Sequence, residues 1–167
     1  MIDFNLFKRT IELLEKNNVQ FWVFGGFALD GIRGKITREH GDIDIYLDSD
    51  DLTKLEKLFD SKEYNFYKRE KMYFVESTDL KLGIVILTKE NDLVIANGNK
   101  TIAKYPKKMF SKETIVSINS FTFRVVPFEI LFLESNFSRF KEDKLFGKNI
   151  KINRELYGEI ETIKIRD

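Results

Sequence analysis

The chain has 167 residues, and its 28 Lys and Arg nearly balance 27 Asp and Glu, which leaves a formal charge of +1. This near-neutral charge disfavours nucleic acid as a partner relative to a small charged molecule. The absence of cysteine excludes disulfides, thiolate metal sites and cysteine nucleophiles.

The length fits one globular domain over residues 1–167, with a smaller helical segment from about residue 127. No segment approaches the roughly 20 apolar residues of a membrane span, and the N-terminus lacks the basic and apolar stretches of a secretion signal. These features predict a soluble, cytoplasmic protein with no membrane partner.

The first elements are indicated by apolar spacing. A helix is predicted over residues 4–16, because Asp3 can cap it and apolar residues recur at helical spacing within it. These residues are Phe4, Phe7, Ile11 and Leu14. Residues 20–24 then predict a buried strand that ends at Gly25 and Gly26, and residues 27–32 a short helix.

Residues 42–47 alternate strictly between polar and apolar side chains. A strand in this stretch projects Asp42 and Asp44 from one face, while Ile43 and Ile45 project from the other. A capped helix ending near residue 60 is expected to follow, since leucines recur on one of its faces.

Further strands are predicted over residues 64–68, 72–76 and 80–87, and the last of these is the most apolar and therefore central in the sheet. The segment 91–108 is polar and turn-rich around Asn97-Gly98-Asn99, so we expect a loop there.

The C-terminal third begins with a predicted hairpin of residues 114–118 and 121–125, which turns at Asn119-Ser120. Pro127 is suited to open a following helix. The charged stretch 138–167 is expected to be helix that is less tightly held. Together the elements predict an α+β fold.

The pair Asp42 and Asp44 is a candidate metal site. Magnesium takes one or two protein carboxylates together with phosphate oxygens and water, and two carboxylates so close repel each other without a cation. By itself, however, an Asp-x-Asp strand is more often an ordinary solvated face.

Gly25 and Gly26 are a candidate phosphate site, because glycine between a strand and a helix lets the backbone and the helix N-terminus approach an anion. Taken alone, such a pair is more often only a tight turn. The turn precedes Asp42 by sixteen residues, a gap that returns the chain to the sheet beside the first strand. The two sites are therefore expected to be neighbours.

The run of residues 25–30, followed by Gly34 and then by residues 37–45, resembles the lincosamide and aminoglycoside 2''-nucleotidyltransferases of the DNA polymerase beta-like superfamily. The resemblance is specific over residues 21–47. It implies a nucleotidyltransferase fold with a mixed, mostly antiparallel sheet flanked by helices. It also implies transfer of a nucleoside monophosphate to an antibiotic hydroxyl with the help of Mg²⁺ or Mn²⁺. The transferred group is expected to be AMP from MgATP, and another nucleoside triphosphate as co-substrate stays open.

The same resemblance assigns roles to particular residues. It implies that Gly25 and Gly26 line the triphosphate and that Asp42 and Asp44 are the catalytic metal ligands. Arg38 also matches, and two interpretations of it are equally favoured: a phosphate contact, or a salt bridge to Asp30 that braces the loop.

Two other residues of this loop are interpreted structurally. His40 is the only histidine of the chain, and its place just before the metal strand favours bracing of the loop over catalysis. Lys35 beside Gly34 is interpreted as a solvated side chain.

The match breaks at the third carboxylate that the family carries on a later strand. Our placement puts Gly83 there, and Glu76, Asp79 or Asp92 is left as a candidate replacement. Three hypotheses follow: a transferase acting on a small-molecule hydroxyl, a catalytically weak nucleotide-binding partner protein, or a transferase acting on a protein or RNA end. The acceptor and the oligomeric state, including a homodimer, stay open.

Overall fold

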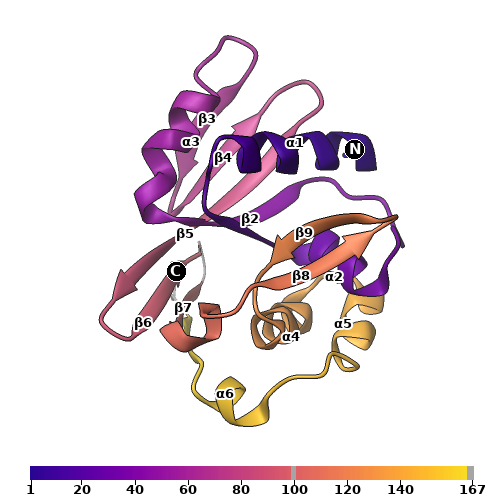
Figure 1. The fold of residues 1–167 in the computed structure, drawn as a ribbon, viewed down its shortest axis with the longest axis vertical. Coiled ribbons are helices and arrows are strands. Elements are labelled where there is room, and N and C mark those ends of the chain that lie inside the picture. The colour runs from indigo at the N-terminus through magenta and orange to yellow at the C-terminus, as the bar shows by residue number, and fades with distance from the viewer. Residues whose placement is uncertain (99–100, 165–167) are drawn as a thin grey trace.

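The structure, a computed structural model, describes residues 1–98 and 101–164 as helices packed on one mixed sheet (Figure 1). The helices are α1 (Phe4–Lys16), α2 (Gly25–Arg33), α3 (Leu52–Leu58), α4 (Phe128–Phe137), α5 (Lys141–Gly147) and α6 (Arg154–Gly158). The strands are β1 (Phe21–Phe24), β2 (Ile43–Asp48), β3 (Asn65–Arg69), β4 (Met72–Glu76), β5 (Lys81–Glu90), β6 (Leu93–Asn97), β7 (Thr101–Pro106), β8 (Thr114–Ile118), β9 (Phe121–Val125) and β10 (Glu161–Lys164). Among the described helices, none is long and apolar enough to cross a membrane.

The described strands are arranged in the order β10-β7-β6-β5-β2-β1-β9-β8, with β4 and then β3 added beside β5. The pairs β2–β5 and β1–β9 are parallel, whereas the other pairs are antiparallel. This confirms the predicted α+β fold with a mixed, mostly antiparallel sheet. Because β2 lies between β1 and β5, Asp44 is paired with Phe24 on one side and Gly83 on the other.

Aromatic rings join α1 to the rest of the molecule. The ring of Phe7 on α1 stacks on Phe27 of α2 with centroids 4.1 Å apart, and it meets Phe123 of β9 edge-on at 4.9 Å. All three side chains are buried. The N-terminus of α1 is capped as predicted, since the Asp3 carboxylate accepts a hydrogen bond of 2.7 Å from the backbone N–H of Leu6. This packing fixes α2 against the sheet.

Glycine allows α2 to lie close to the hairpin of β8 and β9. A Cβ added at Gly31 would collide with the side chains of Val116 and Phe123, so a larger residue would push the helix away. The beginning of α2 is consequently held at the end of β1, directly beside β2 (Figure 1).

The structure confirms the predicted elements through β5, and β5 is central in the sheet as expected. It also confirms the hairpin of β8 and β9, and the helix α4 that begins after Pro127. These elements were recognisable because their apolar spacing matches the period of a helix or a strand.

Two predictions in the C-terminal half were wrong. The segment 91–108 is not a loop: β6 and β7 pair as a hairpin, whose register joins Ala96 to Ala103, and β6 also pairs with β5. Of the expected turn, Asn99 lies outside the described residues. The stretch from 138 is not helical throughout either, because β10 pairs with β7 after α5 and α6. In both segments, hydrogen bonds to a neighbouring strand stabilise the β-structure. The polar residues of these segments gave no indication of it. Residues 165–167 lie outside the described part.

Candidate nucleotide site

A cavity of about 340 Å³ opens where the end of β1, the start of β2 and the helices α4 and α5 meet. We call it the Asp42 cavity. Residues 38–42, which precede β2, form one of its walls. Its lining includes Phe24, Gly25, Gly26, Arg38, His40, Asp42, Asp44, Glu134, Ser138, Arg139, Phe140 and Asp143. Every residue that the sequence assigned to the site therefore lines one cavity.

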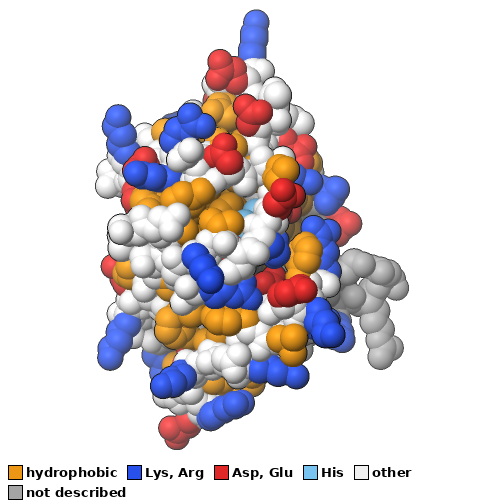
Figure 2. Space-filling view, turned by 90° about the vertical axis from the view of Figure 1, so that its right-hand side faces the viewer, with side chains coloured by type: hydrophobic (Ala, Val, Ile, Leu, Met, Phe, Trp, Pro, Cys, Tyr) orange, Lys and Arg blue, Asp and Glu red, His pale blue; other side chains and the backbone are white. Residues whose placement is uncertain are grey.

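The surface of the molecule carries mixed charge. On the face shown in Figure 2, Lys and Arg side chains alternate with Asp and Glu around a central band of hydrophobic side chains. An uninterrupted basic surface of the kind that neutralises a nucleic-acid backbone does not occur among the described residues of this face.

The two glycines approach the acidic and basic side chains of the site closely. Gly25 has φ +69°, and a Cβ there would lie 2.8 Å from Oδ2 of Asp44. At Gly26 a Cβ would lie 2.5 Å from Nη2 of Arg38 and 2.6 Å from Nδ1 of His40. The glycines are thus required both by the backbone conformation and by side chains that pack directly over the turn.

Asp42 directly precedes β2 and Asp44 is its second residue, and both side chains line the Asp42 cavity. Burial raises the pKa of Asp44 to about 7, and the charges of Asp42 and Glu134 add to this effect, while Arg38 and Arg139 oppose it. Like charges close together at a half-buried position favour a proton or a cation between them. The pair therefore meets the first requirement of a cation site.

The donors present suit magnesium better than a metal that needs a complete protein cage. Among the described residues, no group of three or more His, Asp or Glu side chains is arranged to hold a metal ion. Mg²⁺ commonly takes one or two carboxylates and completes its coordination with water and substrate phosphates. Asp44 lies between the glycines Gly25 and Gly83, and both Asp42 and Asp44 line the open cavity, which fits that mode.

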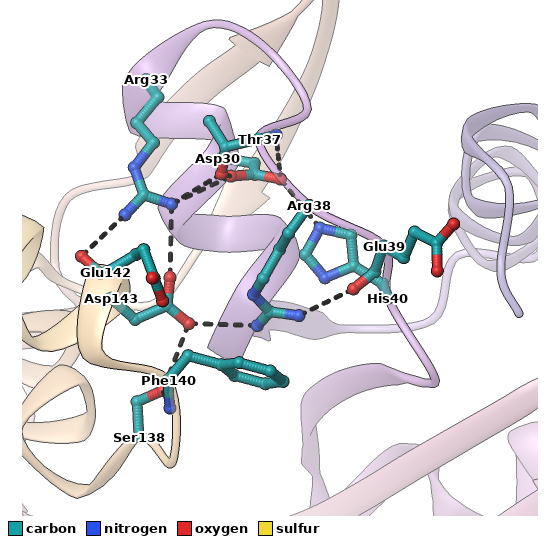
Figure 3. Close-up of polar contacts among 10 residues, drawn as sticks. All are labelled: Asp30, Arg33, Thr37, Arg38, Glu39, His40, Ser138, Phe140, Glu142 and Asp143. Carbon is teal, nitrogen blue, oxygen red and sulfur yellow. Dashed lines mark hydrogen bonds and ion pairs between the residues drawn. The ribbon is translucent and has the colours of Figure 1, made fainter.

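Arg38 is held over the cavity by an ion pair that joins α5 to the loop before β2 (Figure 3). Its Nη2 lies 3.0 Å from Oδ2 of the buried Asp143, and its guanidinium lies 3.9 Å from the centre of the Phe140 ring. Of the two interpretations of Arg38, the salt bridge to Asp30 does not occur in the described part of the chain, where Arg33 pairs with Asp30 at 3.1 Å. A partner 105 residues away in the chain is supplied by tertiary packing.

Asp143 connects two arginines. Besides Arg38, it accepts a hydrogen bond of 3.3 Å from Arg33 and one of 3.2 Å from the hydroxyl of Ser138. Arg33 also contacts Asp30, so α2, the loop before β2 and α5 share one chain of ion pairs (Figure 3). This chain closes one side of the Asp42 cavity.

The structure places His40 in a bracing role, as predicted. Its Nε2 lies 2.8 Å from Oδ2 of Asp30, both side chains are buried, and its ring stacks on Phe27 with centroids 4.0 Å apart. Although burial opposes ionisation of Asp30, hydrogen bonds from His40, Thr37 and Arg33 lower the pKa of this carboxyl. Lys35 is exposed in the same loop and does not line the cavity.

Gly83, where our placement puts the third carboxylate of the family, pairs directly with Asp44 in the register of β2 and β5. None of the three candidate replacements lines the Asp42 cavity. Glu76 faces Lys81 at 3.8 Å, and Asp79 and Asp92 line two separate cavities that do not contain Asp44.

Sequence reasoning missed Glu134 and Arg139, which line the Asp42 cavity. Both belong to the region of α4 and α5, where apolar spacing indicated only a helix. No local pattern distinguishes them from ordinary surface charges, since they reach the site through the packing of α4 beside the sheet.

Comparison with known families agrees with this geometry. The sequence profile of the family described as aminoglycoside-2''-adenylyltransferase matches residues 6–129. The chain belongs to this family. The family identifies it as a nucleotidyltransferase of the antibiotic adenylyltransferases and implies ATP as the co-substrate. No individual curated protein sequence gave a match.

Solved structures share the fold of this family member. The lincosamide antibiotic adenylyltransferase LnuA, in its lincomycin-bound form, has a TM-score of 0.70 and 19% identity, and the match covers 89% of this chain and 96% of LnuA. ANT(2'')-Ia in complex with adenylyl-2''-tobramycin has a TM-score of 0.61 and 14% identity, over 87% of this chain and 85% of that chain. At these identities the likeness establishes the nucleotidyltransferase fold.

Proposed function

We propose that this protein transfers AMP from MgATP to a hydroxyl group of a small molecule resembling a lincosamide or an aminoglycoside. One observation carries the proposal: the glycine turn, the two aspartates and two arginines line the same cavity. Nucleotidyl transfer needs these parts together, because a polyphosphate must be neutralised and held beside divalent metal.

Each part has a distinct task in this proposal. Asp42 and Asp44 hold Mg²⁺, which when bound neutralises phosphate oxygens and draws charge from the leaving pyrophosphate. The backbone N–H groups at Gly25 and Gly26 begin α2 and face the triphosphate. Arg38 adds positive charge, and its buried Nε has no hydrogen-bond partner among the described residues.

The choice of acceptor rests on the solved relatives, which carry lincomycin and an adenylylated tobramycin. Both compounds bear hydroxyl groups, so a panel of lincosamides and aminoglycosides is the first to test. The mixed surface charge in Figure 2 favours such small acceptors over an RNA end.

The test is incubation of the protein with ATP, Mg²⁺ and each acceptor, followed by mass spectrometry. We expect one acceptor to gain the mass of one AMP unit, and we expect Asp42→Ala to abolish the gain. Asp60→Ala is the matched control, because Asp60 is exposed beyond α3 and should leave transfer unchanged. Binding of MgATP without transfer to any acceptor would contradict the proposal.

A catalytically weak nucleotide-binding protein is the second candidate, and the glycine at position 83 is the observation that favours it. Loss of a general base lowers a rate by about 10²–10⁴-fold and leaves binding largely intact. Calorimetry with MgATP separates the candidates: tight binding without turnover supports the second, and turnover at an ordinary enzymatic rate removes it.

A further inference from the structure

Glycine at position 83 leaves the site without an acidic side chain from β5. A Cβ at Gly83 would lie 2.9 Å from Oδ1 of Asp44, so any side chain there would require the Asp44 carboxylate to turn. No acidic residue of β5 lines the Asp42 cavity. If a third carboxylate serves this site, it comes from another element.

Helix α4 carries a carboxylate, that of Glu134, that lies in the Asp42 cavity. Glu134 lines the Asp42 cavity and also an adjoining cavity of about 250 Å³, which we call the Tyr46 cavity. Asp44 and Phe24 line both cavities as well, so Glu134 lies at their junction. The charge of Glu134 also contributes to the raised pKa of Asp44, which indicates that the two carboxylates are close.

Two tyrosines hold Glu134 in position. The Tyr46 hydroxyl donates a hydrogen bond of 2.9 Å to Oε1 of Glu134, and it lies 3.1 Å from the Tyr105 hydroxyl. Because Tyr46 has one hydroxyl proton, Tyr105 is the donor in the second bond. Tyr46 follows Asp44 by two residues on β2 and so projects to the same side.

The second carboxylate oxygen of Glu134 is available to accept a hydrogen bond from a substrate. Oε2 of Glu134 accepts no hydrogen bond from the described part of the chain, whereas Oε1 is fixed by Tyr46. Burial raises the pKa of Glu134, although the hydrogen bond from Tyr46 works against this. A carboxylate with a raised pKa takes up a proton more readily, which suits a general base.

We propose that Glu134 is the general base of this enzyme, acting from α4 in place of an acid at position 83; this inference rests on the proposed transfer of AMP. The acceptor binds with its hydroxyl-bearing part in the Tyr46 cavity. Its hydroxyl proton passes to Oε2 of Glu134 as the oxygen forms a bond to the α-phosphorus. The bond from that phosphorus to the β-phosphate oxygen breaks, and pyrophosphate leaves with the electron pair.

The test compares Glu134→Gln with Glu129→Gln. Glu129 lies on the same helix, but its carboxylate accepts a hydrogen bond from the backbone of Asn153 and lines neither cavity. Calorimetry measures MgATP affinity, and chromatography measures AMP released to water and AMP transferred to lincomycin or tobramycin. We expect Glu134→Gln to lower kcat by about 10²–10⁴-fold while the Kd for MgATP changes by less than about threefold.

A purely structural role would give a different result. It predicts that Glu134→Gln lowers the melting temperature and changes MgATP affinity, with kcat of the folded fraction near that of wild type. The pH profile adds a second readout, because the wild type is expected to show a rise of kcat with pH that loss of the base should remove. An unchanged kcat, or an unchanged pH profile, overturns the proposal.

A crystal structure of the wild type with Mg²⁺ and a nonhydrolysable ATP analogue tests the placement without turnover. We expect the Glu134 carboxylate on the side of the α-phosphorus opposite the pyrophosphate group. A carboxylate that binds the metal or turns away from the α-phosphate overturns the inference. If wild type binds MgATP but transfers AMP neither to water nor to an acceptor, the proposed function fails, and this structure still decides where Glu134 acts.

Discussion

Gly83 and Asp44 are direct partners across β2 and β5, and they are so close that a Cβ on Gly83 would lie 2.9 Å from Oδ1 of Asp44. The absence of a side chain at position 83 therefore leaves space for the Asp44 carboxylate in the orientation that the structure shows.

Gly83→Ala is expected to push the Asp44 carboxylate aside and to weaken MgATP binding about tenfold, which corresponds to about 1.4 kcal/mol. Gly158→Ala is the matched control, because nothing lies within 4 Å of a Cβ at that position. Calorimetry with MgATP measures both. Equal affinities for the two variants would show that Asp44 does not depend on the space at Gly83.

The raised pKa of Asp44 predicts how stability depends on pH in metal-free protein. Its folded pKa of about 7 exceeds the ordinary value of 3.8, so the folded state binds more protons between these values. Stability is then greatest at low pH and falls as the pH rises through this window. Asp44→Asn should remove the penalty and stabilise the protein at pH 8 by on the order of 1–4 kcal/mol.

Urea unfolding at pH 5 and pH 8 with EDTA measures this effect. The gain from Asp44→Asn should be larger at pH 8 than at pH 5, because the wild-type carboxyl is mostly protonated in the folded state at the lower pH. An Asn variant that is less stable than wild type at pH 8 would contradict the assigned burial and charge repulsion.

Ligand binding should stabilise the fold by linkage. MgATP at about one hundred times its Kd is expected to add about 2.7 kcal/mol to the free energy of unfolding. For a chain of this size, each kcal/mol raises the melting temperature by about 2–4 °C. Thermal unfolding with ATP alone, Mg²⁺ alone and both together measures the effect. Asp42→Ala should lose the shift that requires both, and a full shift in this variant would exclude Asp42 as a ligand.

The ion pairs around Asp143 are expected to be important for both stability and nucleotide binding. Asp143→Asn leaves Arg38 without its carboxylate and leaves Arg33 with Asp30 alone, and loss of one partner of a buried pair costs about 3–5 kcal/mol. It should also weaken MgATP binding, since Arg38 loses its position. Glu142→Gln, at the exposed neighbouring residue, is the control. Equal unfolding midpoints in urea for the two variants would contradict this role.

Local sequence patterns were sufficient to predict the helices and strands of the first half of the chain. The alternation of residues around Asp42 and Asp44 is required by the two faces of a strand. The glycine pair Gly25 and Gly26 is required where the backbone lies close to other groups. The strand that carries Gly83 was recognised as well, because β5 is a long apolar strand.

Local patterns could not predict the ion-pair partner of Arg38 or the position of Glu134 in the Asp42 cavity. Arg38 pairs with a residue 105 positions away, and Glu134 lines the same cavity as Asp44 because α4 packs beside the sheet. The hairpin of β6 and β7 was missed since its polar residues suggested a loop, although each strand gains its hydrogen bonds from a neighbour.

The sequence by itself determined the family, the α+β class and the strand that carries the two aspartates, because these depend on residues close together in the chain. Only the tertiary structure decided which charges share the cavity, which arginine pairs with which acid, and that Glu134 lines the same cavity as Asp44. Such relations depend on distances between side chains from separate elements, and those distances are set by how the helices pack on the sheet.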